Sequence, residues 1–227
     1  MAALQPVTDS LTTTTSLGEV IGSHRVLRNT YALLALTLTC SAGMATLSAS
    51  MGWPHPGILL TLGGYFGLLF LTAKLSNSGW GLLSMFALTG FMGYTLGPVI
   101  NQYLQVPNGV QLVATAFAAT AITFFAQSAY VLTTRRNFDF MGGFLMAGMI
   151  VAVLAGLAAA FLNIGMLSLV VSAVVVLLMA GMILFETSRI INGGESNYIM
   201  ATVGLYVSIF NLFTSLLHLL GFTSDSE

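Results

Sequence analysis

The stretch MLSLVVSAVVVLLMAGMILF, residues 166–185, is an apolar run that contains no charged side chain. About 20 apolar residues suffice for an α-helix to cross the hydrocarbon layer of a membrane. The run is followed at once by ETSR, residues 186–189, and then interrupted by NGGES, residues 192–196. We therefore predict a membrane-spanning helix with a carboxylate, Glu186, close to one end.

The composition of the whole chain supports the same conclusion. Among its 227 residues only six are Lys or Arg and seven are Asp or Glu, while 56% are hydrophobic. So apolar a chain could not cover its surface with solvated side chains, which indicates an integral membrane protein.

Apolar runs of similar length recur along the chain, separated by short loops that contain Pro, Gly, Asn or Ser. The seven runs are residues 30–50, 57–73, 79–101, 110–133, 140–162, 166–189 and 198–221. They lack the alternation of membrane-barrel strands, and an open sheet would leave backbone hydrogen-bonding groups unsatisfied in lipid. We predict an all-α integral membrane protein, a bundle of seven transmembrane helices over residues 23–222.

The basic residues fall on one side of this arrangement. With the N-terminus in the cytoplasm, the cytoplasmic side holds all six: Arg25, Arg28, Lys74, Arg135, Arg136 and Arg189. An excess of Lys and Arg marks the cytoplasmic side of membrane proteins. We predict a cytoplasmic N-terminus and a short external C-terminal tail, residues 223–227, which carries Asp225 and Glu227.

The N-terminal segment from Met1 to Gly22 differs from the rest of the chain. It reads MAALQPVTDSLTTTTSLGEVIG, rich in Thr and Ser and without a periodic apolar face. Its beginning has no basic residue and no continuous apolar region, so it is not a cleaved signal peptide. We expect a flexible cytoplasmic tail.

Small residues predict where helices approach closely. Gly63 and Gly67 in the second run, and Gly93 and Gly97 in the third, have the four-residue spacing of close transmembrane helix contacts. We expect a structural role for both pairs.

The seventh run carries a polar stripe. At 100° per residue, one narrow arc contains Gly204, Ser208, Asn211, Ser215 and His218. Such a stripe is better buried among helices than turned to lipid. It either holds neighbouring helices together or lines a central cavity.

Glu186 shares a face of the sixth run with Ser168 and Ser172, so we expect its carboxylate to point into the bundle. An ionisable group at membrane depth is a candidate functional residue. The alternative is a structural ion pair with Arg189, three residues further along the helix.

The sequence contains no strong residue pattern of an enzyme active site. Glu186 has no partner carboxylate at membrane depth, and Ser215 and His218 share one helix without a GxSxG turn. The three His residues lie in different segments without the spacing of zinc ligands. We therefore expect no enzyme, no cofactor, no metal site and no nucleic-acid partner.

Several long motifs resemble the bacterial YccA branch of the Bax inhibitor family. They are HRVLRNTYALLALTL (24–38), LTGFMGYTLGPVIN (88–101), SAYVLTTRRNFDFMGGFLMAG (128–148) and ILFETSRIINGGESNYIMATVGLYVS (183–208), followed by IFNLFTSLL. The resemblance runs from about residue 24 to residue 222. It implies a seven-helix bundle in the bacterial inner membrane, with the last helix near the centre.

This branch is similar to an inner-membrane protein that binds the ATP-dependent membrane protease FtsH and restrains its degradation of membrane proteins. The resemblance therefore implies a non-enzymatic modulator whose partners are an FtsH-type protease and the lipid bilayer. A protease that pulls on a cytoplasmic end needs a segment to grip, and residues from Met1 to Gly22 are the candidate.

Other members of the family are proton-sensitive calcium leaks, in which two facing acids on the sixth and seventh helices form a latch. Glu186 matches the first acid, but the second position is Ser208. Because calcium prefers several oxygen ligands, commonly anionic, this chain lacks half of the latch. The alternative function is thus a pH-sensitive calcium or cation leak, with Glu186, Arg189, Ser208 and Asn211 as candidate gating or ion-path residues.

Overall fold

The computed structural model describes residues 5–224, and the side chains of residues 24–222. Residues 5–224 form seven long α-helices and one short 3-10 helix, with no strand in that range. They are α1 (Gln5–Ser50), α2 (Ile58–Leu75), α3 (Trp80–Leu104), α4 (Gly109–Thr134), η1 (Asp139–Met141), α5 (Gly142–Leu162), α6 (Gly165–Ile191) and α7 (Tyr198–Ser224). Each of the seven contains a segment long and apolar enough to cross a membrane, which confirms the predicted fold class.

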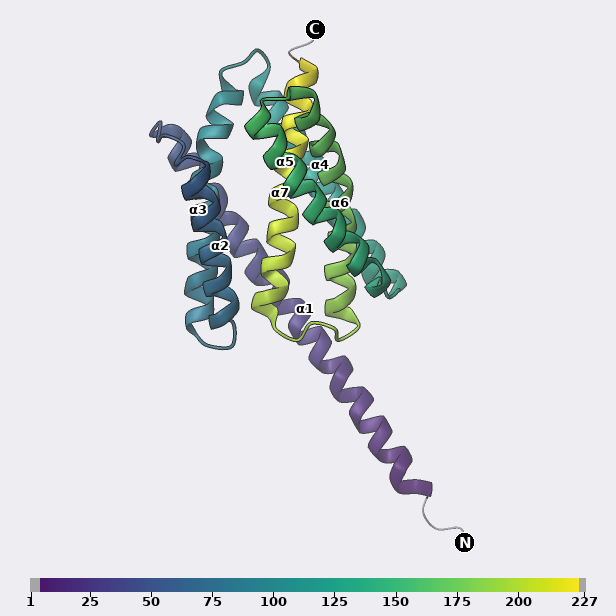
Figure 1. The fold of residues 1–227 in the computed structure, drawn as a ribbon. Helices are drawn as coiled ribbons and strands as arrows, with labels where there is room; N and C mark the ends of the chain where they lie inside the picture. Colours follow the sequence, from purple (N-terminus) through teal and green to yellow (C-terminus); the bar gives the residue numbers. More distant parts are fainter. Residues whose placement is uncertain (1–4, 225–227) are drawn as a thin grey trace.

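The N-terminal segment continues the first span. The backbone of residues 5–22 is helical and continues α1, which projects beyond the other helices (Figure 1). A helix extends more easily than it nucleates, so an existing span can propagate into flanking Thr and Ser residues. That the segment is a flexible tail stays a prediction. Met1 among residues 1–4, and Asp225 and Glu227 among residues 225–227, lie outside the described residues.

The last helix occupies the centre of the bundle. It packs against α1, α3, α4 and α6, whereas α2 packs on α3 and α5 packs on α6 (Figure 1). The core is formed by large apolar side chains with 0–1% of their surface exposed, among them Met85, Leu88, Met179, Ile183, Leu205 and Leu212. The central last helix agrees with the family resemblance.

Only one of the two glycine pairs lies at a close helix contact. A Cβ atom on Gly93 would collide with the backbone carbonyl oxygen of Ser41 on α1, and one on Gly97 would lie 2.8 Å from that of Ala45. Gly63, by contrast, has no atom within 4 Å of a built Cβ. The third run thus packs as predicted, while the prediction for the second run was wrong because α2 lies at the periphery of the bundle.

Candidate functional site

Three interhelical connections meet at one end of the bundle. The Asn197 side-chain amide, before α7, donates to Ser76 O at 3.1 Å and to Asn77 Oδ1 at 3.0 Å, between α2 and α3. The Ser188 hydroxyl of α6 donates to Arg136 O at 3.2 Å and accepts from Phe138 N at 2.9 Å, between α4 and α5. The six basic residues lie at or beside these connections and the start of the α1 span, so we call this the basic end.

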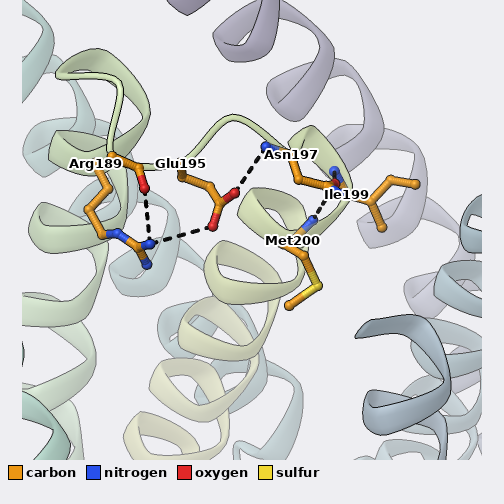
Figure 2. A network of polar contacts seen from close by, with 6 residues as sticks. Arg189, Glu195, Asn197, Ile199 and Met200 are labelled. Atoms are coloured by element: carbon orange, nitrogen blue, oxygen red, sulfur yellow. Dashed lines mark hydrogen bonds and ion pairs between the residues drawn. The ribbon is translucent and has the colours of Figure 1, made fainter. Parts of the chain in front are cut away.

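Asn197 organises the start of α7. Its Oδ1 accepts hydrogen bonds from Ile199 N at 2.9 Å and Met200 N at 3.2 Å, and its own N–H donates to Glu195 Oε1 at 2.9 Å (Figure 2). An Asn at this position satisfies N–H groups that the first helical turn leaves unpaired. One side chain thus caps α7 and also ties it to the connection between α2 and α3.

Arg189 belongs to this network. Its Nη2 lies 3.6 Å from Glu195 Oε2 and donates to Gly194 O at 3.1 Å (Figure 2). Its guanidinium carbon also lies 5.5 Å from the centre of the Phe185 ring. The chain reverses after α6, where Gly193 has a φ of 76°, and this turn brings Glu195 back to the end of the helix.

The alternative in which Arg189 pairs with Glu186 is therefore wrong: within residues 24–222 the ion pair of Arg189 is with Glu195. Glu195 was not predicted as the partner of Arg189, because its approach depends on the reversal of the chain after α6. The NGGES segment, with two consecutive glycines, was the signal for such a turn.

The Glu186 carboxylate points into the bundle, as predicted, and it lies against α7. A Cβ atom on Gly204 would lie 2.7 Å from the Glu186 carboxyl carbon and 2.8 Å from Oε1, so the missing side chain at residue 204 leaves room for the carboxylate. One turn further along α7, Ser208 is buried and its hydroxyl donates to Gly204 O at 2.9 Å. The Asn211 amide donates to Val207 O at 2.8 Å, also within its own helix.

The polar stripe of α7 continues towards the opposite end of the bundle. There, His218 Nε2 and Ser168 Oγ of α6 are 3.1 Å apart, and Ser172 donates to Ser168 O at 3.0 Å. Two residues of α6 thus contact the polar stripe of α7: Glu186 lies against Gly204 near the basic end, and Ser168 contacts His218 near the opposite end. Of the predicted site residues, the structure brings Glu186 against the stripe near Ser208, and it places Arg189 in the separate network around Glu195.

Comparison with known proteins decides the family. The family described as "Inhibitor of apoptosis-promoting Bax1" matches residues 23–225. The chain belongs to the Bax inhibitor family. With seven helices long and apolar enough to cross a membrane, this Bax inhibitor protein is a multi-pass membrane protein.

Three relatives in this family cover most of the chain. An uncharacterized protein of Pseudomonas aeruginosa is 55% identical over 202 residues, 89% of this chain and 91% of that protein. The modulator of FtsH protease YccA of Escherichia coli K12 is 53% identical over 205 residues, 90% of this chain and 93% of that protein. The inner membrane protein YccA of Escherichia coli O6:H1 shows the same identity and coverage.

A second polar seam of this Bax inhibitor protein, between α1 and α7, was not predicted. Ser41 Oγ and Tyr206 Oη lie 2.7 Å apart, and Tyr206 Oη also donates to Thr89 O of α3 at 3.4 Å. Thr202 Oγ1 donates to Thr30 O at 3.4 Å. The available signal was a polar face on the first span, whose buried members are Thr30, Thr37, Ser41 and Ser48.

The chemistry open to the Glu186 site is limited. Within residues 24–222 no group of three His, Cys, Asp or Glu side chains is placed to hold a metal ion. On α7, Glu186 faces Gly204, and the nearby Ser208 hydroxyl already donates to a backbone oxygen of its own helix. Of the two latch positions that the resemblance implies, this Bax inhibitor protein thus has an acid at Glu186 and a hydroxyl at Ser208.

Proposed function

We propose that this chain is a non-enzymatic inner-membrane protein that binds and inhibits an ATP-dependent membrane protease of the FtsH type. The observation that carries the proposal is the 53% identity, over 90% of this chain, to a relative named as a modulator of FtsH protease. The family match, residues 23–225, includes all seven spans, which supports a bundle of the same kind in both proteins. In this role the protein influences the quality control of membrane proteins.

The N-terminal segment is the part that we expect the protease to engage. The helical backbone of residues 5–22 leaves the bundle at its basic end and projects away from the other helices (Figure 1). A lone helix of this length is marginally stable in water, so an ATPase could unwind it and grip it with little resistance. With the basic end in the cytoplasm, the segment lies on the side where such an ATPase works.

The bundle behind the segment resists extraction. Pulling on α1 would separate it from α3, where Gly93 lies against the backbone of Ser41, and from α7, to which Ser41 is hydrogen-bonded through Tyr206. Each span removed from lipid would also expose its apolar surface to water. The protein would then occupy the protease as a slow or stalled substrate.

The test is a pulse-chase of the full chain and a form lacking residues 2–20, each with active and with inactive protease. We expect the deletion to lengthen the lifetime of the protein only where the protease is active, and membrane insertion to be unchanged. A matched control replaces residues 2–20 with a Gly and Ser sequence of equal length, which should restore the shorter lifetime. Equal lifetimes in all conditions would remove the segment from the mechanism.

Binding is tested separately from turnover. Gentle solubilisation of native membranes should co-purify the protease with the full chain, and raised levels of the chain should lengthen the lifetime of another membrane substrate. The modulator role itself would be refuted if the protease did not co-purify with the full chain and if raised levels of the chain did not slow degradation of the other substrate. This outcome is distinguishable from a failure of the N-terminal segment alone.

A second candidate function is a pH-sensitive cation leak. The specific observation in its favour is a carboxylate, Glu186, within the sixth span and directed at Gly204 on the central helix. Calcium flux into liposomes, measured at several pH values, should then change on Glu186→Gln, which keeps the size of the side chain and removes its charge. Absence of flux in both forms would refute this function.

A further inference from the structure

A cavity of about 680 Å³ lies at the basic end, between the start of the α1 span and the end of α4. It is lined by His24, Arg25, Leu27, Arg28, Tyr31 and Leu132. None of these residues belongs to the Glu186 site or to the Asn197 network, so the cavity is a separate feature of the molecule.

The lining follows from the helical repeat of α1. Residues 24, 27, 28 and 31 recur every three or four positions and so lie on one face of the helix, and Arg25 flanks that face. Leu132 supplies the opposite wall from α4. The rings of Tyr31 and Phe124 lie 5.9 Å apart, so the side chains of α1 and α4 also meet deeper in the bundle.

The cavity is basic at its mouth and apolar at its wall. Arg25 and Arg28 are exposed, and within residues 24–222 no acidic side chain forms an ion pair with either. Guanidinium groups bind phosphate oxygens through paired, charge-assisted hydrogen bonds. Leu27, Tyr31 and Leu132 provide the apolar wall beside them.

The position of the cavity favours a lipid over a soluble anion. Arg25 and Arg28 come just before the uncharged run of residues 30–50, so they lie near the end of the membrane-crossing part of α1 where charged side chains can reach lipid headgroups. On α4, an exposed apolar stripe leads from Leu132 towards the middle of the span, with Phe125 66% and Ile122 69% exposed. Acyl chains can lie along this stripe while a headgroup occupies the basic mouth.

We propose that this cavity binds an anionic phospholipid. Arg25 and Arg28 hold the headgroup phosphate, and Leu27, Tyr31 and Leu132 contact the glycerol and the first acyl carbons. Basic pockets between transmembrane helices are suited to such headgroups, and anionic lipids are attracted to basic juxtamembrane segments. The site does not depend on the role of the protein towards a protease.

The test uses the full-length chain, delipidated in mild detergent and titrated with dioleoyl phosphatidylglycerol, with bound lipid counted by native mass spectrometry. Phosphatidylcholine with the same acyl chains is the zwitterionic reference. At about 1 kcal/mol for each basic residue, two arginines predict roughly a tenfold or greater preference for the anionic lipid. Arg25→Gln/Arg28→Gln should reduce this preference to about one.

Matched variants separate the cavity from general charge. Arg135→Gln/Arg136→Gln removes the same charge from the same end but outside the cavity, and it should keep the preference. Leu132→Trp places a larger ring against the apolar wall of the cavity and leaves both arginines in place, so it should weaken binding. Equal losses in the two arginine pairs, or full binding by Leu132→Trp, would overturn the proposal.

Two further measurements keep the result interpretable. Size-exclusion profiles and melting temperatures show that each variant is folded; if the Gln pair is not, Arg25→Lys/Arg28→Lys replaces it and should show a partial loss. Inorganic phosphate at millimolar concentration is the soluble competitor. Phosphate that displaces the phosphatidylglycerol completely would assign the cavity to a free anion and overturn the lipid assignment.

Discussion

The carboxyl group of Glu186 on α6 lies directly against Gly204 on α7: a Cβ atom at residue 204 would come within 2.7 Å of the carboxyl carbon. Real Cβ atoms essentially never approach so closely, so the carboxylate and a side chain at residue 204 cannot occupy their present places together. The fit of the sixth and central helices near the basic end therefore depends on a glycine opposite an acid.

Gly204→Ala tests this fit. In an open helix the change from Gly to Ala stabilises by about 0.5–1 kcal/mol. Here the new methyl must displace the carboxylate, which is the flexible end of the Glu186 side chain, so we expect this gain to be cancelled and a net loss of up to about 1 kcal/mol. The measurement is the unfolding free energy in detergent, determined for Gly204→Ala both in the natural background and together with Glu186→Ala.

With Glu186→Ala the same glycine substitution should be neutral or stabilising, because the colliding group is gone. Gly63→Ala is the matched control, since Gly63 has no atom within 4 Å of a built Cβ and should show the ordinary gain. Identical effects of Gly204→Ala in both backgrounds would mean that the carboxylate does not limit the contact.

Asn197→Ala should be the most damaging substitution in the network at the basic end. It removes the cap of α7 and both hydrogen bonds to the connection between α2 and α3. Loss of a helix cap alone costs about 1 kcal/mol, and the two lost bonds add to it. Thermal unfolding in detergent measures the total.

Two milder variants separate the contributions to this loss of stability. Asn197→Asp keeps the oxygen that caps α7 but cannot donate to Ser76 or Asn77, so it should lie between the natural protein and Asn197→Ala. Glu195→Gln removes the charge that faces Arg189 and keeps an oxygen for Asn197 N; the pair is partly exposed, so we expect less than about 1 kcal/mol. A larger cost for Glu195→Gln than for Asn197→Ala would contradict this ranking.

Tyr206→Phe tests the seam between α1 and α7. The substitution removes the hydroxyl that lies 2.7 Å from Ser41 Oγ without changing the packing of the ring. Interhelical hydrogen bonds in membranes contribute about 0.6 kcal/mol on average, so we expect a loss of about 0.5–1.5 kcal/mol. Ser41→Ala in the Tyr206→Phe background should cost less than it does alone, whereas Tyr130→Phe, at an exposed position, should cost almost nothing.

Reporter fusions test the orientation. A reporter fused after Thr134, at the basic end, should report the cytoplasm, and one fused after Glu227 should report the opposite compartment. An odd number of spans requires this difference, and the basic residues set its sign. The same compartment for both fusions would contradict the seven-span topology.

The sequence by itself determined that the chain is all-α, how many spans it has and at which end its basic residues gather. These properties follow from local composition, because a membrane demands about 20 apolar residues for each helix and internal hydrogen bonds for the backbone. That the Glu186 carboxylate points into the bundle was also predictable, since Glu186 shares one face of the sixth run with Ser168 and Ser172.

Only the tertiary structure decided which helices meet and which polar groups find each other. It set Gly93 against α1 and left Gly63 with open space, although both glycine pairs have the same spacing. It paired Arg189 with Glu195 instead of Glu186, and it formed the basic cavity between α1 and α4. The physical reason is that lipid is as apolar as the interior of a bundle, so the apolar pattern of a span does not record which of its faces is buried.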